Sequence, residues 1–180
     1  MSLVDTFQDL VAQVPDLVQP LVIAAAAAVP FIEGEGAAVI GIIGGIPPVI
    51  AAVAAIVGNF VCVAVLVLLT ARTRSAVVTH ARARRLTAAG GGDIVETSPA
   101  EPAGERTTAR RAKFQRALER YGVPGVSLLG PLLLPTQFTA TMLAGAGVRT
   151  ARILFWQGLA IVGWTTVLTF LVGGAMYAVH

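Results

Sequence analysis

The sequence predicts an all-helical integral membrane protein, and three observations support this fold class. First, 56% of the 180 residues are hydrophobic and only 13% are charged, a balance typical of a chain that lies in lipid. Second, the apolar residues fall in long runs. Third, most charged residues gather in one segment between those runs. A helix needs roughly 20 apolar residues to cross a hydrocarbon core of about 30 Å. The runs of that length lie at about 17–46, 48–70, 122–147 and 151–178.

The distribution of charge predicts an orientation in the membrane. Residues 72–120 hold eleven of the thirteen Lys and Arg residues and five acidic residues, so their net charge is +6. Basic loops stay on the cytoplasmic side of a membrane. We therefore expect a multi-pass protein of a bacterial-type inner (plasma) membrane with residues 71–120 in the cytoplasm. The basic segment is expected to contact anionic lipid. Residues 71–113 of this segment contain no aromatic residue to interleave with the basic ones, so nucleic acid is not an expected partner.

The cytoplasmic segment divides into parts of different composition. Residues 71–86 can continue the preceding helix as a basic extension. Residues 87–106 are rich in Gly, Pro, Ala and acidic side chains and predict a flexible linker, so 71–106 separates two halves of the chain. Residues 107–121 then place apolar side chains at helical spacing among basic ones. This pattern predicts an amphipathic helix on the inner leaflet.

Two of the apolar runs are interrupted by residues that break helices. The run at about 20–46 contains Pro30 and five glycines, and the run at 122–147 contains three prolines and five glycines. Proline lacks the amide donor and clashes with the preceding turn, so neither run is expected to form one continuous helix. Each piece between breaks is about half a membrane long. We therefore expect two re-entrant hairpins; the alternative is a kinked four-helix membrane bundle.

The order of parts is the same in the two halves. Residues 1–70 give an amphipathic segment, an interrupted run and a clean spanning helix at 48–70. Residues 107–180 give an amphipathic helix, an interrupted run and a clean spanning helix at 151–178. If each hairpin returns to its own side, the halves face opposite ways and form an inverted repeat. A shift of about 100 residues aligns Gly45 with Gly145 and Gly58 with Gly158.

Two stretches resemble a known family. PFIEGEGAAVIGIIGGIPPVIAAVAAIVGNF and RYGVPGVSLLGPLLLPTQFTATMLAGAGVRTARILFWQGLAIVGW are similar to the two halves of the small multidrug export proteins, which look like distant relatives of the DedA or SNARE-associated (VTT) membrane proteins. The two stretches hold 76 of the 180 residues. The resemblance implies opposed hairpins that meet at mid-membrane and an activity that moves polyprenyl phosphate or other lipids across the bilayer. Where those relatives carry an arginine with the second hairpin, this tip offers Thr136, Gln137, Thr139 and Thr141.

Glu33 and Glu35 are the candidate proton or ion-coupling residues. They lie between glycines inside an apolar run, and a charged side chain at membrane depth costs about 2.5–3.5 kcal/mol even on insertion scales. If both carboxylates share one small cavity, like-charge repulsion keeps one of them protonated. The resemblance aligns Glu33 with the acid of the family, which makes Glu35 the modulator. The alternative is that EGEG forms a solvated loop at the outer surface.

The candidate substrate-binding residues are Thr136 and Gln137 at the opposing tip, Arg149 and Arg152 before the last helix, and Asn59. The arginines are equally well explained as interface anchors, and Asn59 as a helix–helix hydrogen bond. We expect a small secondary transporter, proton-coupled, for an amphiphile such as a lipid-linked phosphate. The alternatives are a small multidrug exporter and a non-transporting adaptor that docks through the basic segment. An enzyme, a metal site and a cofactor are not expected, and a homodimer is plausible.

Overall fold

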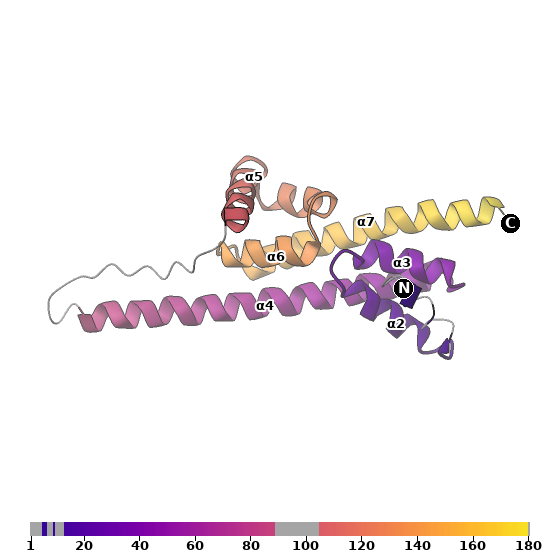
Figure 1. The fold of residues 1–180 in the computed structure, drawn as a ribbon, viewed down its shortest axis with the longest axis horizontal. Coiled ribbons are helices and arrows are strands. Elements are labelled where there is room, and N and C mark those ends of the chain that lie inside the picture. The colour runs from indigo at the N-terminus through magenta and orange to yellow at the C-terminus, as the bar shows by residue number, and fades with distance from the viewer. Residues whose placement is uncertain (1–4, 7–8, 10–12, 89–104, 180) are drawn as a thin grey trace.

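The computed structural model describes the backbone of residues 5–6, 9, 13–88 and 105–179, and the side chains of these except 81–88, 105–113 and 179 (Figure 1). This part of the chain is all helical. Two long helices, α4 (Pro48–Ala88) and α7 (Thr150–Val179), run antiparallel through the molecule. The contacts between the two helices show their opposite directions, since Gly173 of α7 approaches Pro48 of α4, and Gly158, earlier in α7, approaches Phe60, later in α4. The shorter helices pack along this pair.

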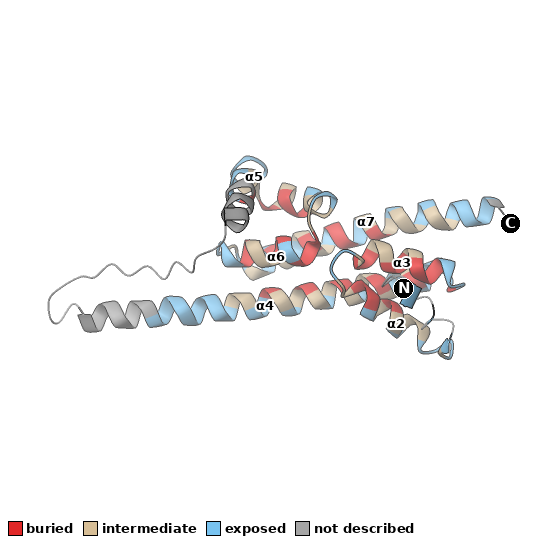
Figure 2. Ribbon diagram, viewed as in Figure 1, coloured by how far each residue is buried: buried red, intermediate tan, exposed pale blue. Residues whose placement is uncertain are grey.

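Both long helices are long and apolar enough to cross a membrane over 48–80 and 150–178. A core helix of a soluble protein would be mostly buried, but only 22% and 17% of their most apolar windows are buried. Exposed apolar side chains recur one helical turn apart on α4, and Figure 2 shows the same alternation of burial along both helices. These α4 residues are Val49, Val53, Val57, Val61 and Val65. Such surfaces fit a lipid environment.

The first interrupted run forms two short helices, α2 (Gln19–Ala27) and α3 (Glu33–Ile43). At 1.5 Å per residue they are about 14 and 17 Å long, so neither crosses a bilayer alone. The alanine run allows α2 to approach α4 very closely. Gly58 of α4 lies so near the backbone of Ala24 that a Cβ added there would be 2.1 Å from its carbonyl oxygen. One turn later, Cys62 Sγ donates a hydrogen bond to the Ala28 carbonyl oxygen at 3.5 Å.

The second interrupted run is also broken where the sequence predicts. Helix α5 (Glu105–Leu129) has a non-helical residue at Gly122 (φ 66°), next to the turn that contains Pro124. The short 3-10 helix η1 (Gly130–Leu132) follows, and then α6 (Thr136–Gly145). Before the break, Phe114 packs into the protein core between α4, α6 and α7, whereas the sequence predicted an amphipathic helix that lies on the inner leaflet.

The helices α3 and α6 end in the same way. After α3, Gly45 has φ 88°, its N–H donates to Ile42, and Ile46 N–H donates to Gly41. After α6, Gly147 has φ 86° and the same two bonds follow, to Ala144 and Leu143. Both are Schellman caps, which favour glycine because the capping residue is left-handed.

The two caps stand at the same distance from the helices that follow them. Gly45 and Gly147 are 102 residues apart, and so are the starts of the following helices at Pro48 and Thr150. The alignment of Gly45 with Gly145, which a shift of about 100 residues gives, does not pair the two caps. Glycines are frequent in both segments, so the sequence alone does not identify the ones that cap the helices.

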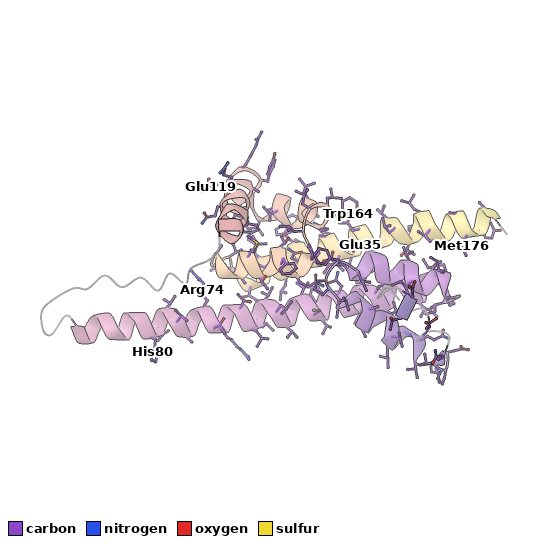
Figure 3. The ribbon with its side chains drawn as sticks, viewed as in Figure 1. Glu35, Arg74, His80, Glu119, Trp164 and Met176 are labelled. Atoms are coloured by element: carbon purple, nitrogen blue, oxygen red, sulfur yellow. The ribbon has the colours of Figure 1, made fainter. Side chains whose placement is uncertain are left out.

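Helix α4 does not end with its apolar part. It continues through the basic segment to Ala88, and its 41 residues make it about 62 Å long. Arg74, in this extension, lies with its guanidinium against Gly147, at the turn between α6 and α7 (Figure 3). Two predicted segments, the N-terminal amphipathic residues up to 12 and the linker over 89–104, fall almost wholly outside the described residues.

Candidate functional site

Glu33 is the first residue of α3, and its side chain is only 6% exposed. The turn that positions it is unusual, because both Phe31 and Glu33 have positive φ angles, 73° and 53°. Left-handed conformations at non-glycine residues cost about 1–3 kcal/mol each and persist only where the surroundings enforce them. The chain therefore holds the Glu33 side chain in one direction, into the molecule.

The partner of the Glu33 carboxylate is the start of α6, 103 residues away. Glu33 Oε1 accepts a short hydrogen bond from the backbone N–H of Thr136. It also accepts one from the Thr136 hydroxyl at 2.8 Å. The N-cap residue of α6, Pro135, supplies no side-chain cap. Glu33 thus satisfies an unpaired amide at the positive end of the α6 dipole.

Asn59 and Gln137 complete this cluster, which we call the Glu33 cluster: Glu33, Asn59, Thr136 and Gln137. All four side chains are buried. Asn59 Oδ1 accepts from Gln137 Nε2 at 3.3 Å and lies 3.4 Å from the Thr136 hydroxyl. That hydroxyl has one proton, so its shorter contact, to Glu33, is the bond it makes while the carboxylate is ionised. If Glu33 became protonated, the hydroxyl could turn to Asn59.

The surroundings of Glu33 act on its pKa in both directions. Burial raises the pKa of this carboxyl to about 7, while the hydrogen bonds from Thr136 side chain and backbone lower it. The charge of Glu35 adds a smaller upward contribution. The protonation of Glu33 therefore depends on its burial and on its hydrogen bonds from Thr136.

Glu35 lies elsewhere. EGEG begins a helix and does not form a loop. Glu35 is half-buried and lines a groove of about 260 Å³ with Phe31 and Leu168. Glu33 does not line this groove, although the charge of Glu35 still acts on the Glu33 carboxylate. The surface-loop alternative fails for Glu33, which is buried.

The predicted binding residues divide into two groups. Asn59, Thr136 and Gln137 are brought together with Glu33, as described above. Arg149 and Arg152 are exposed at the start of α7. Thr165, which approaches Gly34 beside Glu33, is 13 residues after Arg152, a distance of about 20 Å along the helix. The arginines therefore take no direct part in the Glu33 cluster.

Sequence reasoning missed several buried polar residues. Ser127, Gln157 and Thr165 are buried, and their side-chain polar atoms find no hydrogen-bond partner among the described residues. The same holds for Asn59 Nδ2. Gln157 and Thr165 lie two turns apart on the buried face of α7, a spacing that the sequence contains but that does not reveal which face is buried. Unpaired buried groups cost about 1–3 kcal/mol each, so they mark places where water or a ligand would be stabilising.

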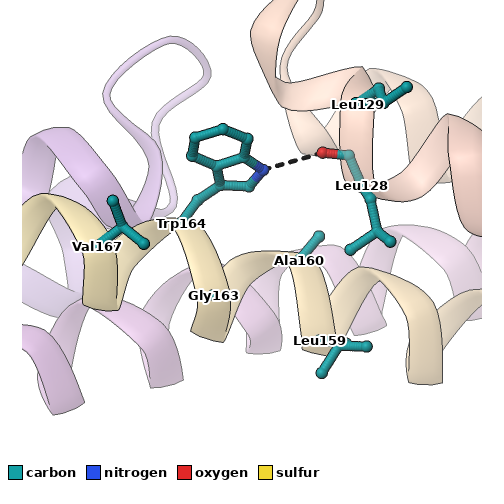
Figure 4. A pocket seen from close by; sticks show the side chains of 7 residues that line it. All are labelled: Leu128, Leu129, Leu159, Ala160, Gly163, Trp164 and Val167. Carbon is teal, nitrogen blue, oxygen red and sulfur yellow. Dashed lines mark hydrogen bonds between the residues drawn. The ribbon is translucent and has the colours of Figure 1, made fainter.

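An apolar groove of about 290 Å³ lies between α5 and α7 (Figure 4). Its wall includes Leu159 and Val167, and Gly163 keeps it open. Trp164 Nε1 donates a hydrogen bond to the Leu128 carbonyl oxygen at 2.9 Å, which satisfies one of the carbonyls at the end of α5. Trp164 precedes Thr165, so the groove lies on the same helix as the residues around Gly34.

The contact between Gly34 and Thr165 gives a prediction for the site. A Cβ at position 34 would lie 2.4 Å from Thr165 Oγ1, so Gly34→Ala should push α3 away from α7 and destabilise the protein by about 1–3 kcal/mol. Thr165→Ala removes the obstructing oxygen. We expect the double variant Gly34→Ala/Thr165→Ala to recover most of the thermal stability in detergent. Equal destabilisation of the single and double variants would show that the two residues are not in contact.

Within the described residues, no three His, Cys, Asp or Glu side chains gather in a group that could hold a metal ion. Comparisons with family models, curated proteins and solved structures gave no match to this chain. The function must therefore be inferred from the buried carboxylate and the side chains around it.

Proposed function

We propose that this protein is a small secondary transporter, coupled to protons through Glu33, that moves an amphiphile such as a lipid-linked phosphate across a membrane. The observation that carries the proposal is the buried Glu33 carboxylate bonded to the start of α6. A carboxylate enclosed between apolar helices is expensive and is usually retained for function. A buried carboxylate that joins the start of α3 to the start of α6 is suited to couple a proton to the movement of these two helices.

The proposal includes an inverted repeat in which α4 and α7 span the membrane and the hairpins at about 20–46 and 122–147 enter it without crossing. The common register of 102 residues, the matching glycine caps and the antiparallel course of the long helices support this arrangement. Glu33 and Thr136 begin equivalent helices, and equivalent elements meet one another at a two-fold axis. Their contact therefore fits a pseudo-axis at the Glu33 cluster, which is where broken-helix transporters bind substrate.

The remaining parts of the proposal concern the surroundings of the site. The basic extension of α4 lies in the cytoplasm with the rest of residues 71–120, and its exposed arginines contact anionic lipid. The apolar groove beside Trp164 offers a surface on which the hydrocarbon part of an amphiphile can lie. Its polar end then lies toward the Glu33 cluster.

Proteoliposomes with an imposed pH gradient test the proposal, with polyprenyl phosphate as the substrate. Glu33→Gln keeps the size of the side chain but cannot exchange a proton, so we expect gradient-driven uptake to fall to background. Glu35→Gln is the matched control, because Glu35 faces a different groove, and it should reduce uptake without abolishing it. Wild-type uptake and an unchanged pH profile in Glu33→Gln would show that this carboxylate does not couple protons.

A further inference from the structure

We propose that the start of α6 is an anion-binding site, which the Glu33 carboxylate fills when no ligand is bound. Once protonated, Glu33 leaves this site and the monoanionic group of a ligand takes its place. This inference rests on the proposed function and deepens it, because it names the charge of the ligand and the reason why a proton must accompany it.

The first step is the position that Glu33 occupies. Its carboxylate sits on the backbone amide and the hydroxyl of Thr136, at the positive end of the ten-residue helix α6. A helix N-terminus is a general binding place for anions. The side chain that fills this place comes from α3, which is far from α6 in the chain. A group held by a separate element can withdraw when that element moves.

The second step is an excess of hydrogen-bond donors beside Glu33. Asn59 and Thr165 are both fully buried, and Asn59 Nδ2 and Thr165 Oγ1 have no partner among the described residues. Both atoms lie near Gly34. A Cβ added to Gly34 would be 3.6 Å from Asn59 Nδ2 and 2.4 Å from Thr165 Oγ1. Nδ2 can only donate. Glu33 alone leaves these groups unsatisfied, and a ligand with several acceptor oxygens would satisfy them.

The third step is a balance of charge. With Glu33 ionised and no ligand, the site carries one negative charge. With Glu33 protonated and a monoanion bound, it again carries one negative charge. The exchange therefore takes up one proton for each anion and leaves the charge of the buried site unchanged, which avoids the large cost of adding a second buried charge.

Among the other ionisable groups near Glu33, the charge of Glu35 raises the pKa of Glu33 slightly, but it is present before and after the exchange and leaves the count of charges unchanged. Glu35 lies on the same helix and faces the groove with Phe31, and Cys62 on α4 bonds to a carbonyl of the α2–α3 turn. Helices α2 and α6 contain no ionisable side chain. On α4 and α7 the nearest arginines, Arg72 and Arg152, are each 13 residues from the nearest site residue, about 20 Å along the helix.

Calorimetric titration of the detergent-solubilised full chain tests the inference. Octyl sulfate is the probe, because its sulfate stays a monoanion across neutral pH. Titration in two buffers with different heats of ionisation counts the protons taken up. We expect one proton per octyl sulfate above the pKa of Glu33, with the affinity falling about tenfold per pH unit. Inorganic sulfate is the second arm: weaker binding assigns the site to an amphiphile headgroup, and equal binding assigns it to free anions. Either result supports the exchange.

Two variants make the test specific. Glu33→Gln removes the competing charge and should bind octyl sulfate with an affinity that no longer depends on pH and with no proton uptake. Asn59→Ala keeps Glu33 but removes a donor, so binding should weaken while one proton is still taken up. Binding without proton uptake in the wild-type protein, or a preference for octyltrimethylammonium, would overturn the inference. Proton-linked binding without any transport would contradict only the proposed function.

Discussion

Gly58→Ala should destabilise the protein more than any other single-methyl change in the long helices. The added Cβ would meet the carbonyl oxygen, carbonyl carbon and Cα of Ala24 at 2.1–2.6 Å. These are backbone atoms, so no side chain can rotate away and α2 must separate from α4. Overpacking costs about 1–3 kcal/mol, and a rigid backbone contact belongs at or above the upper end of that range. Thermal unfolding in detergent measures the loss.

The control for this variant is Gly163→Ala on α7. A Cβ there has no heavy atom within 4 Å. Both changes bring the same gain in helix propensity, about 1 kcal/mol, so the difference between them isolates the clash. Gly163→Ala should be as stable as the wild type or slightly more so. If the two variants unfold at the same temperature, α2 and α4 are not in contact at this point.

Thr136→Val should move the pH dependence of transport upward. The Thr136 hydroxyl donates to the Glu33 carboxylate at 2.8 Å and so favours its ionised form, which lowers the pKa. Valine keeps the shape but removes the donor, so the pKa of Glu33 rises. A hydrogen bond to a charged group contributes about 1.5–3 kcal/mol, which corresponds to about 1–2 pKa units. Glu33 then keeps its proton to higher pH, and the uptake profile shifts in the same direction.

Infrared spectroscopy can follow the same change directly through the carbonyl stretch of a protonated carboxyl group, with Glu33→Gln to identify the band. Thr141→Val is the matched control on α6, because the Thr141 hydroxyl donates to the Phe138 carbonyl oxygen at 2.9 Å and does not contact Glu33. It should leave the profile in place. A Thr136→Val protein that titrates like the wild type would mean that the hydroxyl does not bind the carboxylate.

The sequence was sufficient to place the helices and the breaks between them. Proline and glycine determine local backbone conformation, so the breaks near Pro30 and Gly122 follow from residue type alone. The continuation of α4 beyond residue 70 also follows from local pattern, because no helix-breaking residue intervenes before 88.

The site could be predicted only in part. The residue types of the Glu33 cluster are unusual in an apolar run, and this drew attention to Glu33, Asn59, Thr136 and Gln137. The resemblance favoured Glu33 over Glu35, but residue type alone could not show which carboxylate points inward, because each is flanked by glycine on at least one side and the left-handed backbone at Phe31 and Glu33 sets the direction. Thr165 could not be identified as a residue of this site from the sequence. Its role depends on a contact with Gly34, 131 residues earlier in the chain.

Helix α4 is continuous from Pro48 to Ala88, so a tilt at one point moves its far end. Gly58, where α2 rests on this helix, is 30 residues from its end at Ala88, which is about 45 Å of helix. A tilt of about 10° about Gly58 would displace that end by about 8 Å, because a straight helix of this length moves as a rod. Between the two points, Arg74 rests on the turn after α6. A small tilt at Gly58 therefore becomes a displacement of several ångströms at the Ala88 end of the helix.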